Sequence, residues 1–151
     1  MKKNLFDEAV KNEIINRSLK LTDVQQPKWG KMNAPEMLRH CSEAIKSTLT
    51  QPTHFKPSSL KQILGRYAML YLIPRYPHGA KTPRKLDMKI NNVTGLTLTG
   101  EKKYFAERIN LFYRYDKNIT TNHSYFGNMN RKQWGIITWM HMDHHLRQFG
   151  V

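Results

Sequence analysis

The chain has 151 residues, of which 39% are hydrophobic and 24% are charged, as in folded globular proteins and unlike disordered chains. Lysine and arginine total 25 against 11 acidic residues, so the net charge is +14 and nucleic acid has to be considered as a partner. The length is near that of one domain, and we expect a single domain over residues 1–151.

The basic residues are spread along the chain, singly or in pairs, from Lys2 to Arg147. A nucleic-acid footprint usually concentrates them on one helix or arm, so this distribution favours a solvated basic surface over a nucleic-acid partner. The longest apolar stretch, residues 67–74, is too short to cross a bilayer. We expect it to lie in a core helix, and we expect no membrane partner.

Two features favour a cytoplasmic location. Mixed charges follow Lys2 and Lys3, where an export signal would have an uninterrupted apolar region. Cys41 is the single cysteine, so no internal disulfide can form and packing has to supply the stability.

Apolar residues that recur every three or four positions predict amphipathic helices along most of the chain. The first helix is expected from about Leu5 to Leu19, before Pro27. The second follows a capping box, in which Asn33 precedes Glu36 by three residues and Pro35 lies in the first turn. The apolar face of the first helix contains Phe6, Val10, Ile14 and Leu19. The inner face of the second contains Met37, Cys41, Ala44, Ile45 and Thr48.

A third helix is predicted over residues 59–73, and residues 74–100 then form a long irregular stretch that contains three prolines and three glycines. Stretches of this length are typical of crossovers, lids or binding elements, and weak β-like pairing around residues 90–98 is an additional expectation. A fourth helix would end near residues 116–118. The apolar residues of the third helix are Leu60, Ile63, Leu64, Tyr67 and Tyr71. Those of the fourth are Phe105, Ile109, Phe112 and Tyr113.

The last helix is predicted to begin at Arg131, because Asn130 and Gln133 form a second capping box. Its continuous stripe predicts which residues face the core. The stripe contains Trp134, Ile137, Thr138, His141, His145 and Gln148.

The histidines of this last helix could bind one ion together. His141 and His145 are separated by one helical turn and about 40°, so both rings project from one face. His144 lies about 100° from His145, so we expect it to hydrogen-bond near the site or to be exposed. His40 flanks the inner face of the second helix, and facing helices can bring it to the same depth. The alternative is that these imidazoles hydrogen-bond to core neighbours or water.

Two segments carry a family resemblance, WGKMNAPEMLRHC around His40 and HSYFGNMNRKQWGIITWMHMDHHLRQFG at the end of the chain. The sequence resembles the DinB/YfiT-like superfamily of metal-dependent enzymes, in a subfamily of unknown function. The resemblance implies an all-α fold, an up-down-down-up four-helix bundle whose long crossover contains an extra helix. It also implies metal ligands at His40, His141 and His145, the set that helix geometry selects.

Three neutral imidazoles leave open positions on zinc or nickel, which is typical of a reactive site. The resemblance therefore implies a hydrolase or a thiol-dependent S-transferase that acts on a small-molecule substrate, with a low-molecular-weight thiol as a further cofactor and a homodimer as a candidate assembly. Two alternatives stay open. One is a basic nucleic-acid-binding module, and the other is a metal-stabilised interaction protein without turnover.

The remaining chemically active residues receive weaker roles. Cys41 is expected to be a small buried core residue, with a nucleophile as the alternative. His123 could shape the mouth of a pocket. Asp143 is expected to face solvent. Glu36 is interpreted as part of the capping box at the start of the second helix. Glu43 is interpreted as a surface residue. His54 and His78 are placed in loops without a role, and Trp29, Trp134 and Trp139 are interpreted as packing or rim residues.

Overall fold

The computed structural model describes residues 2–50, 56–79, 82–91 and 93–151, and this part of the chain is helical without any β-strand. It contains the α-helices α1 (Glu8–Leu19), α2 (Ala34–Leu49), α3 (Leu60–Tyr67), α4 (Leu98–Arg114) and α5 (Arg131–Gln148). A π-helical turn, Ala68–Leu72, continues α3, and a 3-10 turn, Arg84–Leu86, lies in the connection to α4. The all-α prediction is therefore confirmed. The β-like pairing expected around residues 90–98 is wrong for the described residues there.

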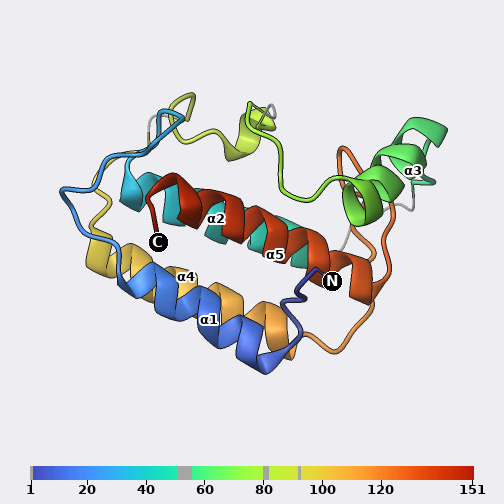
Figure 1. The fold of residues 1–151 in the computed structure, drawn as a ribbon, viewed down its shortest axis with the longest axis horizontal. Helices are drawn as coiled ribbons and strands as arrows, with labels where there is room; N and C mark the ends of the chain where they lie inside the picture. The colour runs from blue at the N-terminus through green and yellow to red at the C-terminus, as the bar shows by residue number, and fades with distance from the viewer. Residues whose placement is uncertain (1, 51–55, 80–81, 92) are drawn as a thin grey trace.

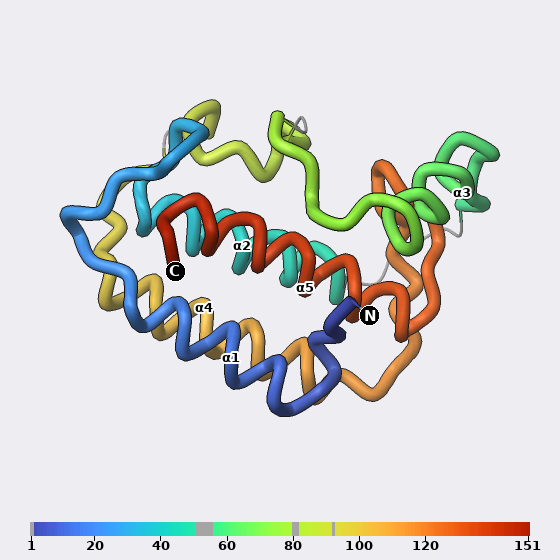
Figure 2. The backbone as a smooth tube through the Cα atoms, in the orientation of Figure 1, coloured from blue at the N-terminus to red at the C-terminus, as the bar shows by residue number. Residues whose placement is uncertain are grey.

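The four longer helices lie alongside one another (Figure 1). Contacts join α2 to α4 and α5, and α1 to the same two helices. The tube in Figure 2 shows that α1 and α5 run in one direction and that α2 and α4 run in the opposite direction. The connection from α2 to α4 therefore has to return to the end of the molecule where α2 began, and α3 lies within this connection.

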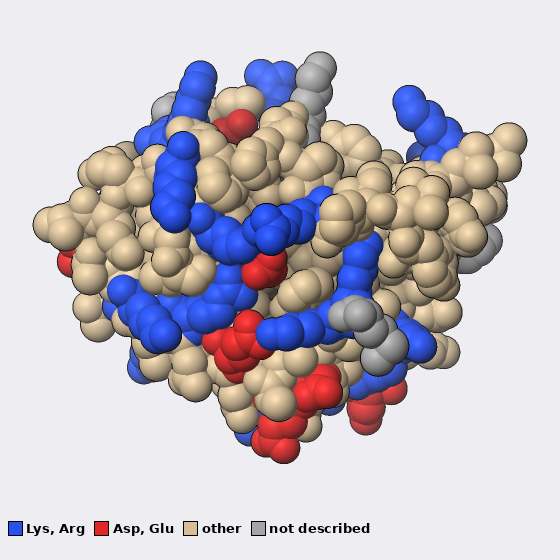
Figure 3. Space-filling model, viewed as in Figure 1, with Lys and Arg blue, Asp and Glu red and all other residues tan. Residues whose placement is uncertain are grey.

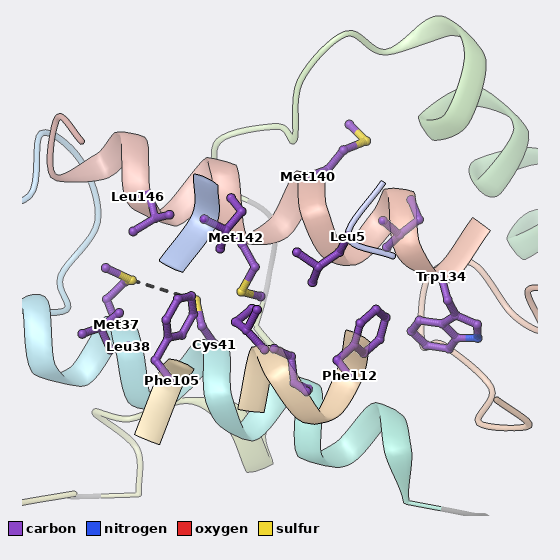
Figure 4. Close-up of a cluster of buried hydrophobic side chains, with 14 of the residues drawn as sticks. Leu5, Met37, Leu38, Cys41, Phe105, Phe112, Trp134, Met140, Met142 and Leu146 are labelled. Atoms are coloured by element: carbon purple, nitrogen blue, oxygen red, sulfur yellow. Dashed lines mark hydrogen bonds between the residues drawn. The ribbon is translucent and has the colours of Figure 1, made fainter. Parts of the chain in front are cut away.

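Large side chains from the four longer helices and from the segments that flank α1 fill the space between them (Figure 4). Burying each of them contributes about 1.5–3 kcal/mol relative to leaving it in water, so this cluster is the main stabilising element. The largest fully buried side chains include Leu5, Ile14, Leu21, Met37, Leu38, Ile45, Phe105, Ile109, Phe112, Met142 and Leu146.

The predicted helix starts that rest on capping boxes are confirmed. Asn33 Oδ1 accepts a hydrogen bond from the Glu36 amide at 2.9 Å, and Glu36 Oε2 accepts one from the Asn33 amide at 2.9 Å. Asn130 and Gln133 form the same pair of bonds at the start of α5. The start of α4 was placed too late, because the Thr97 hydroxyl caps the helix and Leu98 is its first residue.

The first predicted helix ends at Leu19 as expected, but its start and the burial of its last residue need a correction. It begins at Glu8, because the Asp7 carboxylate caps it. Leu19 was predicted to be buried, but it is 54% exposed, whereas Leu5 and Leu21 are buried in its place. Leu5 is held against α5 by a hydrogen bond from its amide to the Gly135 carbonyl at 3.1 Å.

The apolar stretch of residues 67–74 is also corrected. It was predicted to lie in a core helix, but only Met69 and Leu70 are buried there. Tyr67, Tyr71 and Leu72 are exposed, because the opposite, polar face of α3 is the one that contacts the rest of the protein. Among the described residues, no helix is both long and apolar enough to cross a membrane.

Candidate metal centre

Three imidazoles from two helices converge inside the molecule. His40 lies near the middle of α2, and His141 and His145 lie one turn apart on α5. His141 Nε2 is 3.1 Å from His40 Nε2 and 3.0 Å from His145 Nε2. One ring nitrogen from each residue lies within 4.8 Å of the other two, so this cluster could hold a metal ion. The structure thus brings together the three residues that the sequence selects.

Hydrogen bonds fix the orientation of two of these rings. His40 Nδ1 is 2.9 Å from the Leu86 carbonyl oxygen, which can only accept, so Nδ1 carries the proton. His145 Nδ1 is 2.6 Å from Gln148 Oε1, and Gln148 Nε2 donates to the Trp29 carbonyl at 3.1 Å, which identifies the amide oxygen. In a neutral imidazole only one nitrogen is protonated. The Nε2 atoms of His40 and His145 therefore present lone pairs to the centre of the cluster.

A positive charge between the rings would stabilise these lone pairs. His141 Nε2 carries at most one hydrogen, so it cannot donate a well-aligned hydrogen bond to Nε2 of His40 and to Nε2 of His145 at the same time. Burial lowers the pKa of all three histidines, and the neighbouring imidazoles lower the pKa of His141 and His145 further. Protonation is therefore disfavoured, and the neutral form is the one that binds metal.

A pocket of about 720 Å³ opens onto the three histidines. This size is typical of sites for small ligands. Trp29, Tyr76 and His144 form an aromatic wall beside the cluster, and the Trp29 ring stacks on His78 at a centroid distance of 4.2 Å. The wall reaches the cluster itself, because the Tyr76 and His141 rings are 5.7 Å apart.

The other described histidines lie around the cluster without joining it. His144 is buried, and its Nδ1 is 3.3 Å from the Tyr76 carbonyl oxygen, so it belongs to the pocket wall and not to the three-histidine cluster. His123 lines the pocket, as expected, and stacks on Phe126 at 4.6 Å. His78 was given no role from sequence, yet it also lines the pocket. His54 lies outside the described residues.

The remaining candidates have structural roles. Cys41 is buried in the core, and burial raises the pKa of its thiol, which makes a nucleophilic thiolate unfavourable. Asp143 was predicted to face solvent, but it accepts a hydrogen bond from Arg17 Nη1 at 2.8 Å, because α1 packs beside α5. Glu36 caps α2 and pairs with Lys89 at 2.7 Å. Glu43 is only partly exposed, and it accepts a hydrogen bond from the Tyr104 hydroxyl at 3.0 Å.

Two of the three tryptophans agree with the interpretation as packing residues, and Trp29 lines the pocket. Trp134 is buried in the core, and Trp139 packs against its edge. Sequence reasoning missed Tyr76 and His78 in the pocket wall, and it missed Leu86, whose backbone carbonyl orients His40. For Leu86, no sequence signal could reveal this role, because a carbonyl is present at every position.

The fold and the cluster define an all-helical protein with three convergent imidazoles that line a pocket. Residues 4–150 match the model of a family described as "Protein of unknown function (DUF1569)", and the chain belongs to this family. No curated protein and no solved structure matches the chain.

Proposed function

We propose that this protein is a metal-dependent enzyme whose ligands are His40, His141 and His145. The observation that carries the proposal is the convergence of three neutral ring nitrogens, two of them with lone pairs fixed by hydrogen bonds, in the lining of a pocket. Imidazole ligands favour zinc or nickel among the divalent metals. Three ligands from the protein leave coordination positions open toward the pocket, as a reactive site requires.

We further propose a relationship to the DinB/YfiT-like superfamily. The directions of the four longer helices support an up-down-down-up four-helix bundle, with α3 as the extra helix in the crossover between α2 and α4. In bundles of this kind, side chains on facing helices build the metal site. The assignment of the three ligands to α2 and α5 agrees with that arrangement.

The proposed reaction is hydrolysis or thiol-dependent S-transfer on a small molecule. A divalent ion held here would supply Lewis-acid chemistry, by acidifying water or by holding the thiolate of a low-molecular-weight thiol. The chain's own residues orient the ligands and restrict access. Leu86 and Gln148 hold the rings of His40 and His145, and Trp29 and Tyr76 provide an apolar wall that would exclude water from one side of a bound substrate.

Metal analysis of protein purified without a histidine tag tests this proposal. We expect about one transition-metal ion per chain in the wild type, and we expect His141→Ala to lose it, because the central nitrogen of the cluster is removed. His144→Ala is the matched control, since His144 lies on the same helix with its side chain buried but is outside the cluster. Full metal content in His141→Ala would contradict the ligand assignment. A metal-loaded protein that is inactive in hydrolase and thiol-transfer screens would favour an interaction protein without turnover.

A second prediction concerns the residue that orients His145. Gln148→Met removes the oxygen that accepts the His145 Nδ1 proton, so the ring can rotate and the metal affinity should fall by about 10- to 100-fold. Competition against a chromophoric chelator measures this affinity. Gln25→Met is the control, because Gln25 hydrogen-bonds to backbone groups away from the three histidines. An affinity for Gln148→Met that equals the wild-type value would show that the hydrogen bond does not support the site.

A further inference from the structure

The helix α3 and the turn that follows it present an apolar face to solvent. The face consists of Leu60, Ile63, Leu64, Tyr67 and Tyr71. At about 100° of rotation per residue, these five positions fall within an arc of roughly 100° around the helix axis. Tyr67 and Tyr71 lie next to each other on it, with ring centroids 4.9 Å apart. The exposed fractions are 71% for Leu60, 41% for Ile63, 61% for Leu64, 59% for Tyr67 and 68% for Tyr71.

The polar face of the same helix is the one bonded to the protein. Gln62 Nε2 donates to the carbonyl oxygens of His123 and Ser124, each at 3.1 Å. Arg66 Nη1 donates to the carbonyl oxygens of Phe126 and Asn128. These bonds fix the rotation of α3 about its axis. The amphipathic helix is therefore held with its apolar side outward, the reverse of the usual arrangement.

Single exposed apolar residues are common and need no explanation, whereas a contiguous face marks a contact surface. Of the twelve large apolar side chains that are exposed in the described part of the chain, seven lie between Leu60 and Ile73. The other five are spread over the loops and helices, at Leu19, Val24, Ile90, Leu111 and Tyr125. The apolar exposure is thus concentrated on one projecting element (Figure 1).

Charge distinguishes among the partners that could cover this face. Residues 56–79, the described segment that contains α3, include four lysines and arginines and no aspartate or glutamate, so this region is basic. Figure 3 shows a largely uncharged surface over α3 with basic side chains near it. A second copy of the chain would bring the same positive charge against itself, which is unfavourable. Nucleic acid would match the charge, but its phosphate backbone would leave the aliphatic side chains without a partner.

We propose that the exposed face of α3 and the turn that follows it docks on the surface of a membrane containing anionic phospholipids. Leucine and isoleucine enter the boundary between headgroups and acyl chains, the tyrosines suit the interface because their rings are apolar and their hydroxyls stay hydrated, and the lysines and arginines attract the headgroups. This differs from the expectation of no membrane partner, which rested on the absence of a segment long enough to span a bilayer. Surface docking requires no such segment.

Vesicle flotation of the full chain tests the proposal. We expect binding to phosphatidylcholine vesicles that contain about 30% phosphatidylglycerol, at least tenfold weaker binding to pure phosphatidylcholine, and loss of binding when the salt concentration rises from about 0.05 M to about 0.5 M. Absence of binding to the anionic vesicles at low salt would overturn the proposal. Equal binding to both kinds of vesicle would overturn the role of the basic region.

Two triple variants separate this face from general surface hydrophobicity. Leu60→Ser, Leu64→Ser and Tyr71→Ser together should weaken vesicle binding more than tenfold. The matched control carries Leu19→Ser, Val24→Ser and Leu111→Ser, which replace three apolar side chains that are exposed on other elements, and its binding should change by less than about twofold. All six residues are exposed, so both variants should keep the helical circular-dichroism spectrum of the wild type.

Two results would assign the face to another partner. A wild-type dimer that the three α3 substitutions dissociate, without an effect on vesicles, would identify a second copy of the chain as the occupant. Binding of a single-stranded RNA probe that depends on Leu60, Leu64 and Tyr71, again without an effect on vesicles, would identify nucleic acid. Either result overturns docking on a membrane.

Discussion

Lowering the pH from about 7 to about 4 is expected to reduce the free energy of unfolding of the metal-free protein by about 3 kcal/mol through His123 alone. Burial lowers the pKa of His123 from its ordinary value of 6.5 to about 4. Its Nδ1 also accepts hydrogen bonds from the amides of Tyr125 and Phe126, at 3.1 and 3.3 Å. A proton on Nδ1 would remove the lone pair that accepts both.

The direction of the effect follows from proton uptake. Between pH 6.5 and about 4, the unfolded chain binds a proton at this position and the folded chain does not, so acid favours unfolding. The contribution is fully present above pH 6.5, declines as the pH falls through this window, and changes little below about pH 4, where both states are protonated. His40, His141 and His145 act in the same direction in the metal-free protein, because burial also lowers the pKa of each.

Urea unfolding at a series of pH values, with a chelator present, measures this dependence. His123→Asn places an amide oxygen where Nδ1 lies, so it can accept the same amide protons but cannot titrate, and its stability should depend less steeply on pH. His78→Asn is the control, since His78 is exposed and lies in a loop. The comparison uses the slope with pH and not the stability at one pH, because losing the stacking on Phe126 lowers stability throughout. Identical slopes for His123→Asn and the wild type would refute the assignment.

Local signals were sufficient for the two helix starts that a capping box marks and for one side of the cluster. Asn33 and Asn130 marked two helix starts correctly, because a capping box is formed by residues close together in the sequence. His141 and His145 share a face because the helical period alone places them there. The position of His40 opposite them depends on how α2 and α5 pack. Neither helix specifies that packing by itself.

The error on the face of α3 came from contacts with a distant segment. Periodicity correctly gave α3 an apolar side and a polar side, but it could not indicate which side faces the protein. The carbonyls of residues 123–128 decide this, since they bind Gln62 and Arg66. The orientation of His40 by Leu86 likewise joins residues 46 positions apart. Leu19 was misplaced for a local reason: at about 100° per residue it lies about 140° from Ile14, so the helical period itself places it off the buried face, where Ser18 is buried.

The second large effect on the free energy of unfolding is expected at the ion pair between α2 and α4. Arg39 binds Glu101 through two nearly parallel hydrogen bonds, Nε to Oε2 at 2.8 Å and Nη2 to Oε1 at 2.7 Å. The Glu101 side chain is 5% exposed and that of Arg39 is 32% exposed, so the carboxylate is buried while solvent still reaches the guanidinium. Two bonds of this kind fix the relative position of the helices beside His40.

Arg39→Met is expected to lower the free energy of unfolding by about 3 kcal/mol, because it leaves a buried carboxylate without a counter-ion. Exposure of the guanidinium keeps this loss at the lower end of the range for buried pairs. Adding Glu101→Met should recover most of it, since replacing both charges with apolar groups removes the unpaired charge. Urea unfolding of the wild type, both single variants and the double variant gives the coupling energy. A double variant as unstable as Arg39→Met would mean that the loss arises from the packing of Arg39 over the Tyr104 ring, at 4.8 Å, and not from the buried charge.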